Sequence, residues 1–418
     1  MRWLIVEDAL RDRKGHWHEY VAMFAHELRA LGDSVDILAT CEADAFLVSE
    51  LGVKPVLPPS LWHRLGDGAG GLTRLLRFPG HALATYRAMS LYLRVQPEAY
   101  DVIFVPTVSA HHLLGWAPLI KRLLAPGRTR VLFFFIQLPA QIDRTTGKPD
   151  WLPSPTSRAL NLALRWLRKE VARGQVILGA EPEALRHALA TLSGLPAILF
   201  PQPVHRHVDA VAAQPEGLIR MACYGAARAE KGSDLLQQAM RCFLERNPSA
   251  PVRFALQWVE DFVDDAGNAV TLDPQLAADT RVAIIPRYFV GNEYSDHLAR
   301  TDVMLLPYQL RAYQLRGSRV AVEAMVNGIP VVATRGSTFA GQLSLHGAAV
   351  EFDDGDRESL VAAMTEAVAR FQELRSRAHA RRAAAREYYS VAAFRSLLAV
   401  APAESNLPSA APSRAIHP

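Results

Sequence analysis

Three basic residues and one acid occur in two short stretches where a strand is expected to give way to a helix. In the later stretch, Arg316 comes just before Gly317 and Ser318, and Glu323 follows five residues after Ser318. Serine is a favoured first cap of a helix. The free N–H groups at a helix start can hold a phosphate. This stretch therefore suggests a nucleoside-diphosphate site in which Glu323 accepts hydrogen bonds from ribose hydroxyls.

The earlier stretch has the sequence GAARAEKG, and it places two cations at a turn. Gly225 follows the apolar run 219–224, and Arg228 and Lys231 come within six residues of it. Two cations at a strand-to-helix turn can neutralise a diphosphate and stabilise its departure. We expect Arg228 and Lys231 to act in catalysis and Gly225 in donor binding.

Both stretches also have a purely structural interpretation. Residues 302–337 could form a capped helix that carries one exposed glutamate, Glu323. The basic turn could be an ordinary solvated turn. The residue types alone leave these alternatives open.

Together the two stretches resemble the donor site of the retaining glycosyltransferases of family 4, which have the GT-B fold. The resemblance rests on the family's G-x-x-R-x-E-K-G turn and its E-A-M and G-x-P-V-V-A segments, here Gly225, Arg228, Glu230, Lys231, Gly232, Glu323-Ala324-Met325, Gly328 and Pro330-Val331-Val332-Ala333. It implies an α/β protein whose two Rossmann-like domains face each other across a cleft. It also implies transfer of a sugar from a nucleotide-diphosphate donor to an acceptor hydroxyl with retention, without a metal ion or other cofactor.

Two positions depart from the family pattern. Leu315 stands where the family has a first glutamate near the transferred sugar, and Gln137 stands where it has a histidine. Glutamine cannot shuttle protons, but it can hydrogen-bond a sugar hydroxyl. By the same resemblance, Gly15 would let the backbone approach the donor phosphate, and His16 would contact the sugar or acceptor.

The pattern of apolar runs predicts the elements that position these residues. Short buried runs such as 3–6, 102–105 and 130–136 alternate with helical periods, which is typical of parallel α/β domains. We predict an acceptor-side domain over 1–202, a proline-containing linker over 203–216 and a donor domain over 217–382. A closing helix over 383–400 and a disordered tail over 401–418 complete the prediction.

Composition narrows the class of protein. Half of the 418 residues are hydrophobic and 21% are charged, as in globular proteins. The three cysteines, Cys41, Cys223 and Cys242, are far apart and predict neither a disulfide nor a zinc site. No apolar run is long enough for a transmembrane helix, and the N-terminus lacks a signal-peptide pattern. These features predict a cytoplasmic protein, with contact at the inner face of a membrane as a further option.

The net charge of +4 is unevenly distributed. The basic excess lies in the first 200 residues, and residues 72–94 interleave leucines with Arg74, Arg77, Arg87 and Arg94. This segment could be a basic element on a membrane surface that carries a lipid-linked acceptor. The alternative, which the composition favours, is a pair of ordinary helices with a solvated basic face.

Two other functions stay open. Leu315 and Gln137 favour a catalytically silent subunit that binds a nucleotide sugar. A nucleotide-sugar epimerase has the same fold, although the pair Arg228 and Lys231 favours a transferase with a saccharide or lipid-linked acceptor. No stacking aromatic motif supports binding of nucleic acid.

Overall fold

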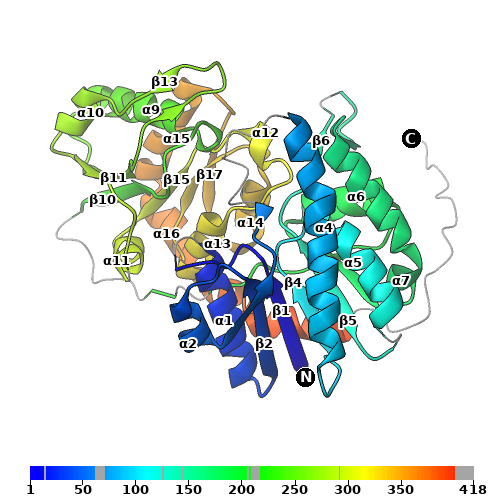
Figure 1. The fold of residues 1–418 in the computed structure, drawn as a ribbon. Coiled ribbons are helices and arrows are strands. Elements are labelled where there is room, and N and C mark those ends of the chain that lie inside the picture. The colour runs from blue at the N-terminus through cyan, green and yellow to red at the C-terminus, as the bar shows by residue number, and fades with distance from the viewer. Residues whose placement is uncertain are drawn as a thin grey trace, which may run out of the picture.

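A computed structural model of the chain describes residues 1–13, 16–61, 71–124, 127–143, 145–204, 207–208, 217–290 and 292–400. The side chains at positions 16, 71–76, 399 and 400 are outside this description. Two parallel sheets with helices on both faces make up the fold (Figure 1).

The first sheet has seven strands in the order β3-β2-β1-β4-β5-β8-β9, and all its pairings are parallel. Its strands are β1 (Arg2–Glu7), β2 (Ser34–Thr40), β3 (Val53–Leu57), β4 (Val102–Val105), β5 (Arg130–Phe135), β8 (Val176–Ala180) and β9 (Ile198–Leu199). Successive side chains of β1 enter different hydrophobic clusters: Leu4 and Val6 lie on one face, and Trp3 and Ile5 on the other. This alternation buries both faces of the strand, as a covered parallel sheet requires.

The helices of this first domain connect consecutive strands. They are α1 (His16–Ala30), α2 (Ala45–Leu51), α4 (Gly71–Arg94), α5 (Ala110–Leu123), α6 (Pro155–Trp166), α7 (Arg168–Ala172) and α8 (Glu183–Ser193). A small hairpin is formed by β6 (Ala140–Ile142) and β7 (Pro149–Trp151). The long helix α4 crosses the front of the domain in Figure 1 and packs against α5.

The second domain contains a six-stranded parallel sheet in the order β14-β11-β10-β15-β16-β17. Its strands are β10 (Ile219–Cys223), β11 (Val252–Gln257), β14 (Val282–Ile285), β15 (Val303–Leu306), β16 (Val331–Thr334) and β17 (Ala349–Phe352). The other elements are the 3₁₀ turn η1 (Ala229–Lys231), α9 (Ser233–Arg246), the hairpin of β12 (Phe262–Val263) and β13 (Ala269–Val270), α10 (Pro274–Ala278), α11 (Glu293–Ala299), α12 (Leu310–Tyr313), α13 (Arg319–Asn327), α14 (Thr338–His346), α15 (Arg357–Ala369) and α16 (Phe371–Tyr388).

The last described helix, α17 (Val391–Val400), belongs to the core of the first domain although it follows the second. Its Phe394 ring lies 4.9 Å from Phe24 and 4.7 Å from Phe200, measured between ring centroids. At the next position, the Arg395 guanidinium donates to both oxygens of Asp33 at 2.6 and 2.9 Å. Helix α17 therefore packs against the N-terminal part of the first domain.

Several helices of the first domain have bounds that the sequence left open. The first helix begins at His16, so this residue, predicted to contact a sugar or acceptor, lies in a helix. The helices α6 and α7 follow each other directly and meet at Leu167. Residues 71–94 form a single helix, α4, and not two, despite the internal Pro79.

Replacing Phe394 with alanine should destabilise the first domain because this ring fills a cluster of aromatic side chains. Truncation of a buried phenylalanine costs about 3–5 kcal/mol, which urea denaturation followed by circular dichroism would detect. Ser396→Ala, an exposed change on the same helix, is the control. A Phe394→Ala protein no less stable than the Ser396→Ala protein would contradict this packing.

Candidate functional site

The turn after β10 places Lys231 over Gly225. Gly225 has a φ of 101°, which favours glycine, and a Cβ atom there would collide with Lys231 Nζ. The Gly225 N–H donates to Gln257 Oε1 at 2.6 Å, which fixes the turn at the carboxyl edge of the sheet. Ligands of parallel α/β sheets bind at this edge.

Three cations converge beside this turn. Burial lowers the pKa of the Lys231 ammonium, and the nearby charges of Arg228 and Arg316 act in the same direction. The carboxylate Glu230 Oε1 lies 3.8 Å from Arg228 Nη1 and 3.5 Å from Arg316 Nη1. One acid among three bases leaves an excess of positive charge, which suits a bound anion.

The start of α13 lies next to these cations. Ser318 Oγ accepts from the Ala321 N–H at 3.2 Å, which confirms the predicted cap. The backbone carbonyl of Arg316 accepts from Thr338 Oγ1 at 2.6 Å, so the segment before the helix is held in place. Gly317 lies against Pro182 of the first domain, with 3.6 Å between Pro182 Cδ and the position of a Cβ at Gly317.

Glu323 is buried, with an exposed fraction of 2%, so the alternative of an exposed glutamate is wrong. Its Oε2 accepts from Tyr294 Oη at 2.7 Å, and its Oε1 accepts from Arg319 Nε at 3.2 Å. A buried carboxylate held by a phenol and a guanidinium remains a strong acceptor. Sequence reasoning missed Tyr294, whereas the i,i+4 spacing of Arg319 and Glu323 is a signal that could have revealed their pair.

Two contacts connect this edge to the first domain. Arg319 Nη2 lies 3.7 Å from Glu19 Oε2 of α1. Glu181, which follows β8, accepts from Gln342 Nε2 of α14 at 2.9 Å and from the Gln202 N–H at 2.8 Å. The carboxyl edges of the two sheets therefore face each other.

Several buried polar atoms between these edges have no hydrogen-bond partner among the described residues. They are Glu7 Oε2 and Tyr20 Oη from the first domain and Arg319 Nη2 and Gln342 Oε1 from the second. The charges of Glu181, Arg319 and Glu7 all act on the Tyr20 hydroxyl, which places these groups in one neighbourhood. Because buried polar atoms in folded proteins are usually hydrogen-bonded, this arrangement fits a ligand that would supply the missing bonds.

The positions that depart from the family pattern lie at the same interface. Leu315 is buried and belongs to the hydrophobic cluster of the first domain that also contains Leu138. Gln137, which directly precedes Leu138, is partly buried just after β5. An apolar side chain therefore occupies the position at which the family has a sugar-binding glutamate. Gly15 lies outside the described residues, and His16 is described only by its backbone.

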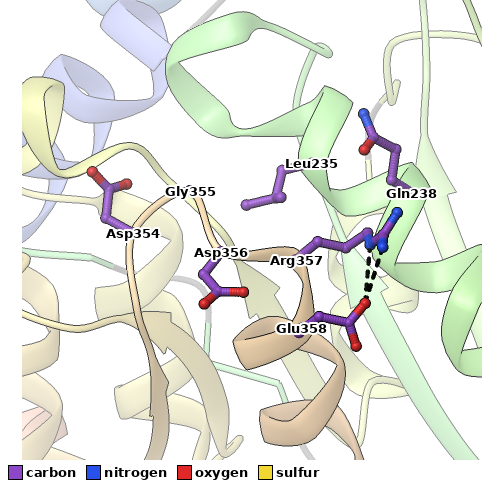
Figure 2. Close-up of a pocket in the computed structure, with 7 residues that line it drawn as sticks. All are labelled: Leu235, Gln238, Asp354, Gly355, Asp356, Arg357 and Glu358. Atoms are coloured by element: carbon purple, nitrogen blue, oxygen red, sulfur yellow. Dashed lines mark hydrogen bonds and ion pairs between the residues drawn. The ribbon is translucent and has the colours of Figure 1, made fainter.

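A surface hollow lies elsewhere on the second domain, where α9 approaches the start of α15 (Figure 2). Three acids contribute to its lining, Asp354, Asp356 and Glu358, and Arg357 is paired with Glu358 at 3.0 Å. Asp356 also caps α15 by accepting from the Ser359 N–H. An acidic lining repels anions, so this hollow suits a diphosphate less well than the basic turn does.

Comparisons with known proteins concern the fold. No family model and no curated protein matches the chain. Sucrose-phosphate synthase from Thermosynechococcus elongatus superposes with a TM-score of 0.61 at 16% identity, over 96% of this chain and 100% of that one. HepE from Anabaena, in complex with UDP, gives 0.59 at 15% identity over 96% and 99%. The catalytic domain of starch synthase IV from Arabidopsis thaliana, bound to ADP and acarbose, gives 0.57 at 12% identity over 95% and 99%.

The chain has the GT-B fold. These structures match over nearly the whole of both chains, which confirms the two Rossmann-like domains predicted from the sequence. At such low identity the likeness extends to the GT-B architecture and not to a particular reaction. The division at residues 203–216 stays a prediction, since residues 209–216 are outside the description.

The contact of Glu181 with the second domain predicts a pH dependence of stability. Burial raises the pKa of Glu181 from 4.5 to about 8, against the opposing hydrogen bonds. The folded carboxyl thus keeps its proton at pH values where the unfolded one has lost it. Stability should then fall as pH rises from about 4.5 to about 8.

Glu181→Gln removes this titration, so its melting temperature should fall less than that of the unmodified protein over this range. Glu98→Gln, at an exposed glutamate, is the control and should behave like the unmodified protein. Identical pH profiles for all three proteins would show that Glu181 is ionised in the folded state.

Proposed function

We propose that the protein is a retaining glycosyltransferase of the family 4 type, which takes its sugar from a nucleotide-diphosphate donor. The observation that supports this most is the convergence of Arg228, Lys231 and Arg316 with the start of α13 and buried Glu323. These groups provide a diphosphate site with a hydrogen-bond acceptor for ribose nearby. HepE with UDP and starch synthase IV with ADP have the same fold, and their bound nucleotides are consistent with a nucleotide site in this protein.

Each part of the site has a role in the proposed reaction. The bond between the anomeric carbon and the diphosphate oxygen breaks, and a bond to the acceptor oxygen forms on the same face of the sugar. The acceptor proton leaves with the departing phosphate. Arg228 and Lys231 stabilise the charge that develops on the diphosphate, which is the largest contribution expected of such a site. The first domain, with Gln137 and Leu315 at the interface, would hold the acceptor.

These cations occupy the role that a divalent ion has in other transferases. We therefore expect transfer to need neither Mg²⁺ nor Mn²⁺. Transfer of the sugar from the donor to the acceptor would require the two domains to close around both. The contact between Arg319 and Glu19 already connects these domains.

A nucleotide-sugar-binding subunit without activity is the second candidate, and buried Leu315 favours it because it removes a polar contact to the sugar. A thermal-shift panel of UDP, ADP and their sugars tests donor binding, since ligands of the folded state raise its melting temperature. NMR of the donor sugar then separates the candidates. A transferase releases sugar slowly to water or passes it to an acceptor with an unchanged anomeric configuration, an epimerase inverts a ring carbon, and a silent subunit changes neither.

Lys231→Ala and Arg228→Ala should each weaken binding of UDP or ADP. Every charge-assisted hydrogen bond lost should cost about 1.5–3 kcal/mol, which isothermal calorimetry can measure. Arg253→Ala removes an exposed positive charge from β11 in the same domain and serves as the control. If all three variants bind as tightly as the unmodified protein, the donor lies elsewhere.

The acceptor in this proposal is anchored in an anionic membrane, and the exposed face of α4 is the contact. Leu83, Leu91 and Val95 are exposed by 48%, 69% and 75% in and just after this helix. Arg87 and Arg94 are exposed beside them. Leucines that enter the interface and arginines that meet lipid phosphates are typical of peripheral helices. Within the described ranges, no helix combines the length and apolarity needed to cross a bilayer.

The double substitution of Arg87 and Arg94 by glutamate should abolish binding to phosphatidylserine vesicles while donor binding persists. Each arginine near an anionic surface contributes about 1 kcal/mol, and high salt should release the unmodified protein. The control carries the same charge change at Arg253 and Arg377 of the second domain, both exposed. Sedimentation with vesicles decides the matter, and an unmodified protein that stays in the supernatant at low salt would mean a soluble acceptor.

A further inference from the structure

A buried cluster in the first domain brings together three histidines and one aspartate from distant parts of the chain. Asp8 directly follows β1, His81 comes from the middle of α4, and His111 and His112 lie in the first turn of α5. All four are buried, and their potential ligand atoms lie within 4.8 Å of one another. Sequence reasoning did not connect them, because their spacing along the chain matches no metal-binding motif.

We propose that Asp8, His81, His111 and His112 bind one transition-metal ion, with Zn²⁺ as the best fit. Three imidazoles and one carboxylate form a nitrogen-rich set of four ligands. Such a set suits tetrahedral Zn²⁺ and disfavours Mg²⁺ and Ca²⁺, which prefer oxygen. The site is separate from the basic turn that the proposed function uses, and it does not depend on that function.

The distances already approach those of a tetrahedral site. Asp8 Oδ2 lies 3.0 Å from His112 Nε2 and 3.2 Å from His81 Nε2. Ligand atoms at about 2.0–2.1 Å from Zn²⁺ would be about 3.3 Å apart in a tetrahedron. The His111 ring lies close by, tilted against His112 at 4.0 Å and edge-on to His81 at 4.8 Å, measured between ring centroids. Rotation of the His111 side chain would complete the fourth corner.

The other ring nitrogens have partners of the kind that metal-binding histidines usually have. Ser109 Oγ lies 2.9 Å from His111 Nδ1 and 3.2 Å from His112 Nδ1. Thr85 Oγ1 lies 3.4 Å from His81 Nδ1. His112 Nδ1 now accepts from the Ser109 backbone N–H at 3.2 Å, so the ring proton lies on Nε2 and faces Asp8. On metal binding this proton would move to Nδ1, where Ser109 Oγ can accept it and where the Ser109 N–H would lose its acceptor. No proton is then lost from that ring.

Hydrogen bonding alone leaves the cluster unsatisfied. His81 Nε2 is buried and lies 3.2 Å from Asp8 Oδ2, but it makes no hydrogen bond of good geometry with any described residue. A single carboxylate oxygen faces the Nε2 atoms of both His81 and His112. A buried nitrogen without a hydrogen bond is uncommon in folded proteins. A metal ion would bond to it directly.

The test uses tag-free, full-length protein equilibrated with Zn²⁺, dialysed and analysed by elemental mass spectrometry. We expect one Zn²⁺ per chain, no retention of Mg²⁺, and the visible absorption of four-coordinate Co²⁺ when Co²⁺ is added instead. His111→Asn should lower Zn²⁺ affinity at least about tenfold. Loss of a residue that only hydrogen-bonds to a metal ligand already costs about 10–100-fold, so loss of a ligand should cost no less. His187→Asn, at an exposed histidine on α8, is the control and should not alter binding.

Ser109→Ala offers a second variant that keeps all four ligands, and it should weaken Zn²⁺ binding by about 10–100-fold. Circular dichroism verifies that each variant is folded. Folded, unmodified protein that retains no Zn²⁺ and gives no four-coordinate Co²⁺ spectrum would overturn the proposal. Equal Zn²⁺ binding by the unmodified protein, His111→Asn and Ser109→Ala would also overturn it.

Discussion

The partly buried ammonium group of Lys231 is the constraint on which the proposed site depends. It lies over Gly225, where only a glycine leaves room for it, and it makes no ion pair with a carboxylate among the described residues. Burying a positive charge is costly unless an opposite charge or hydrogen bonds compensate it. The nearby guanidinium groups add to this cost. A bound diphosphate would offset it, so the same arrangement that disfavours the empty site favours the occupied one.

The interface between the domains combines polar and apolar contacts that have different consequences. Arg319 contacts both Glu323 of its own helix and Glu19 of the first domain. A ligand bound at Glu323 would therefore lie one side chain away from the first domain. Leu315 instead inserts into the hydrophobic cluster of the first domain. That insertion stabilises the contact between the domains but supplies no hydrogen bond to a sugar. Binding of the nucleotide and transfer of the sugar are therefore separate questions for this chain.

Local signals in the sequence were sufficient for much of the fold and for the start of α13. Ser318 marks the start of α13 as predicted, and Gly328 ends it, because helix caps depend on residues next to them in the chain. The burial of Glu323 could not be predicted, since Tyr294 reaches it from another helix. The cluster of Asp8 with three histidines and the packing of Phe394 against Phe24 arise from chain segments that only the tertiary fold brings together.

Binding of UDP and of pyrophosphate to Glu323→Gln, compared by calorimetry, tests most directly whether the second domain holds a nucleotide donor. Pyrophosphate has the charges that Lys231 and its neighbours would bind but lacks ribose. If Glu323 accepts hydrogen bonds from ribose hydroxyls, the substitution weakens binding of UDP and leaves binding of pyrophosphate unchanged. Equal losses for both ligands would make Glu323 a structural residue, and unchanged binding of both would contradict the donor site proposed for this protein.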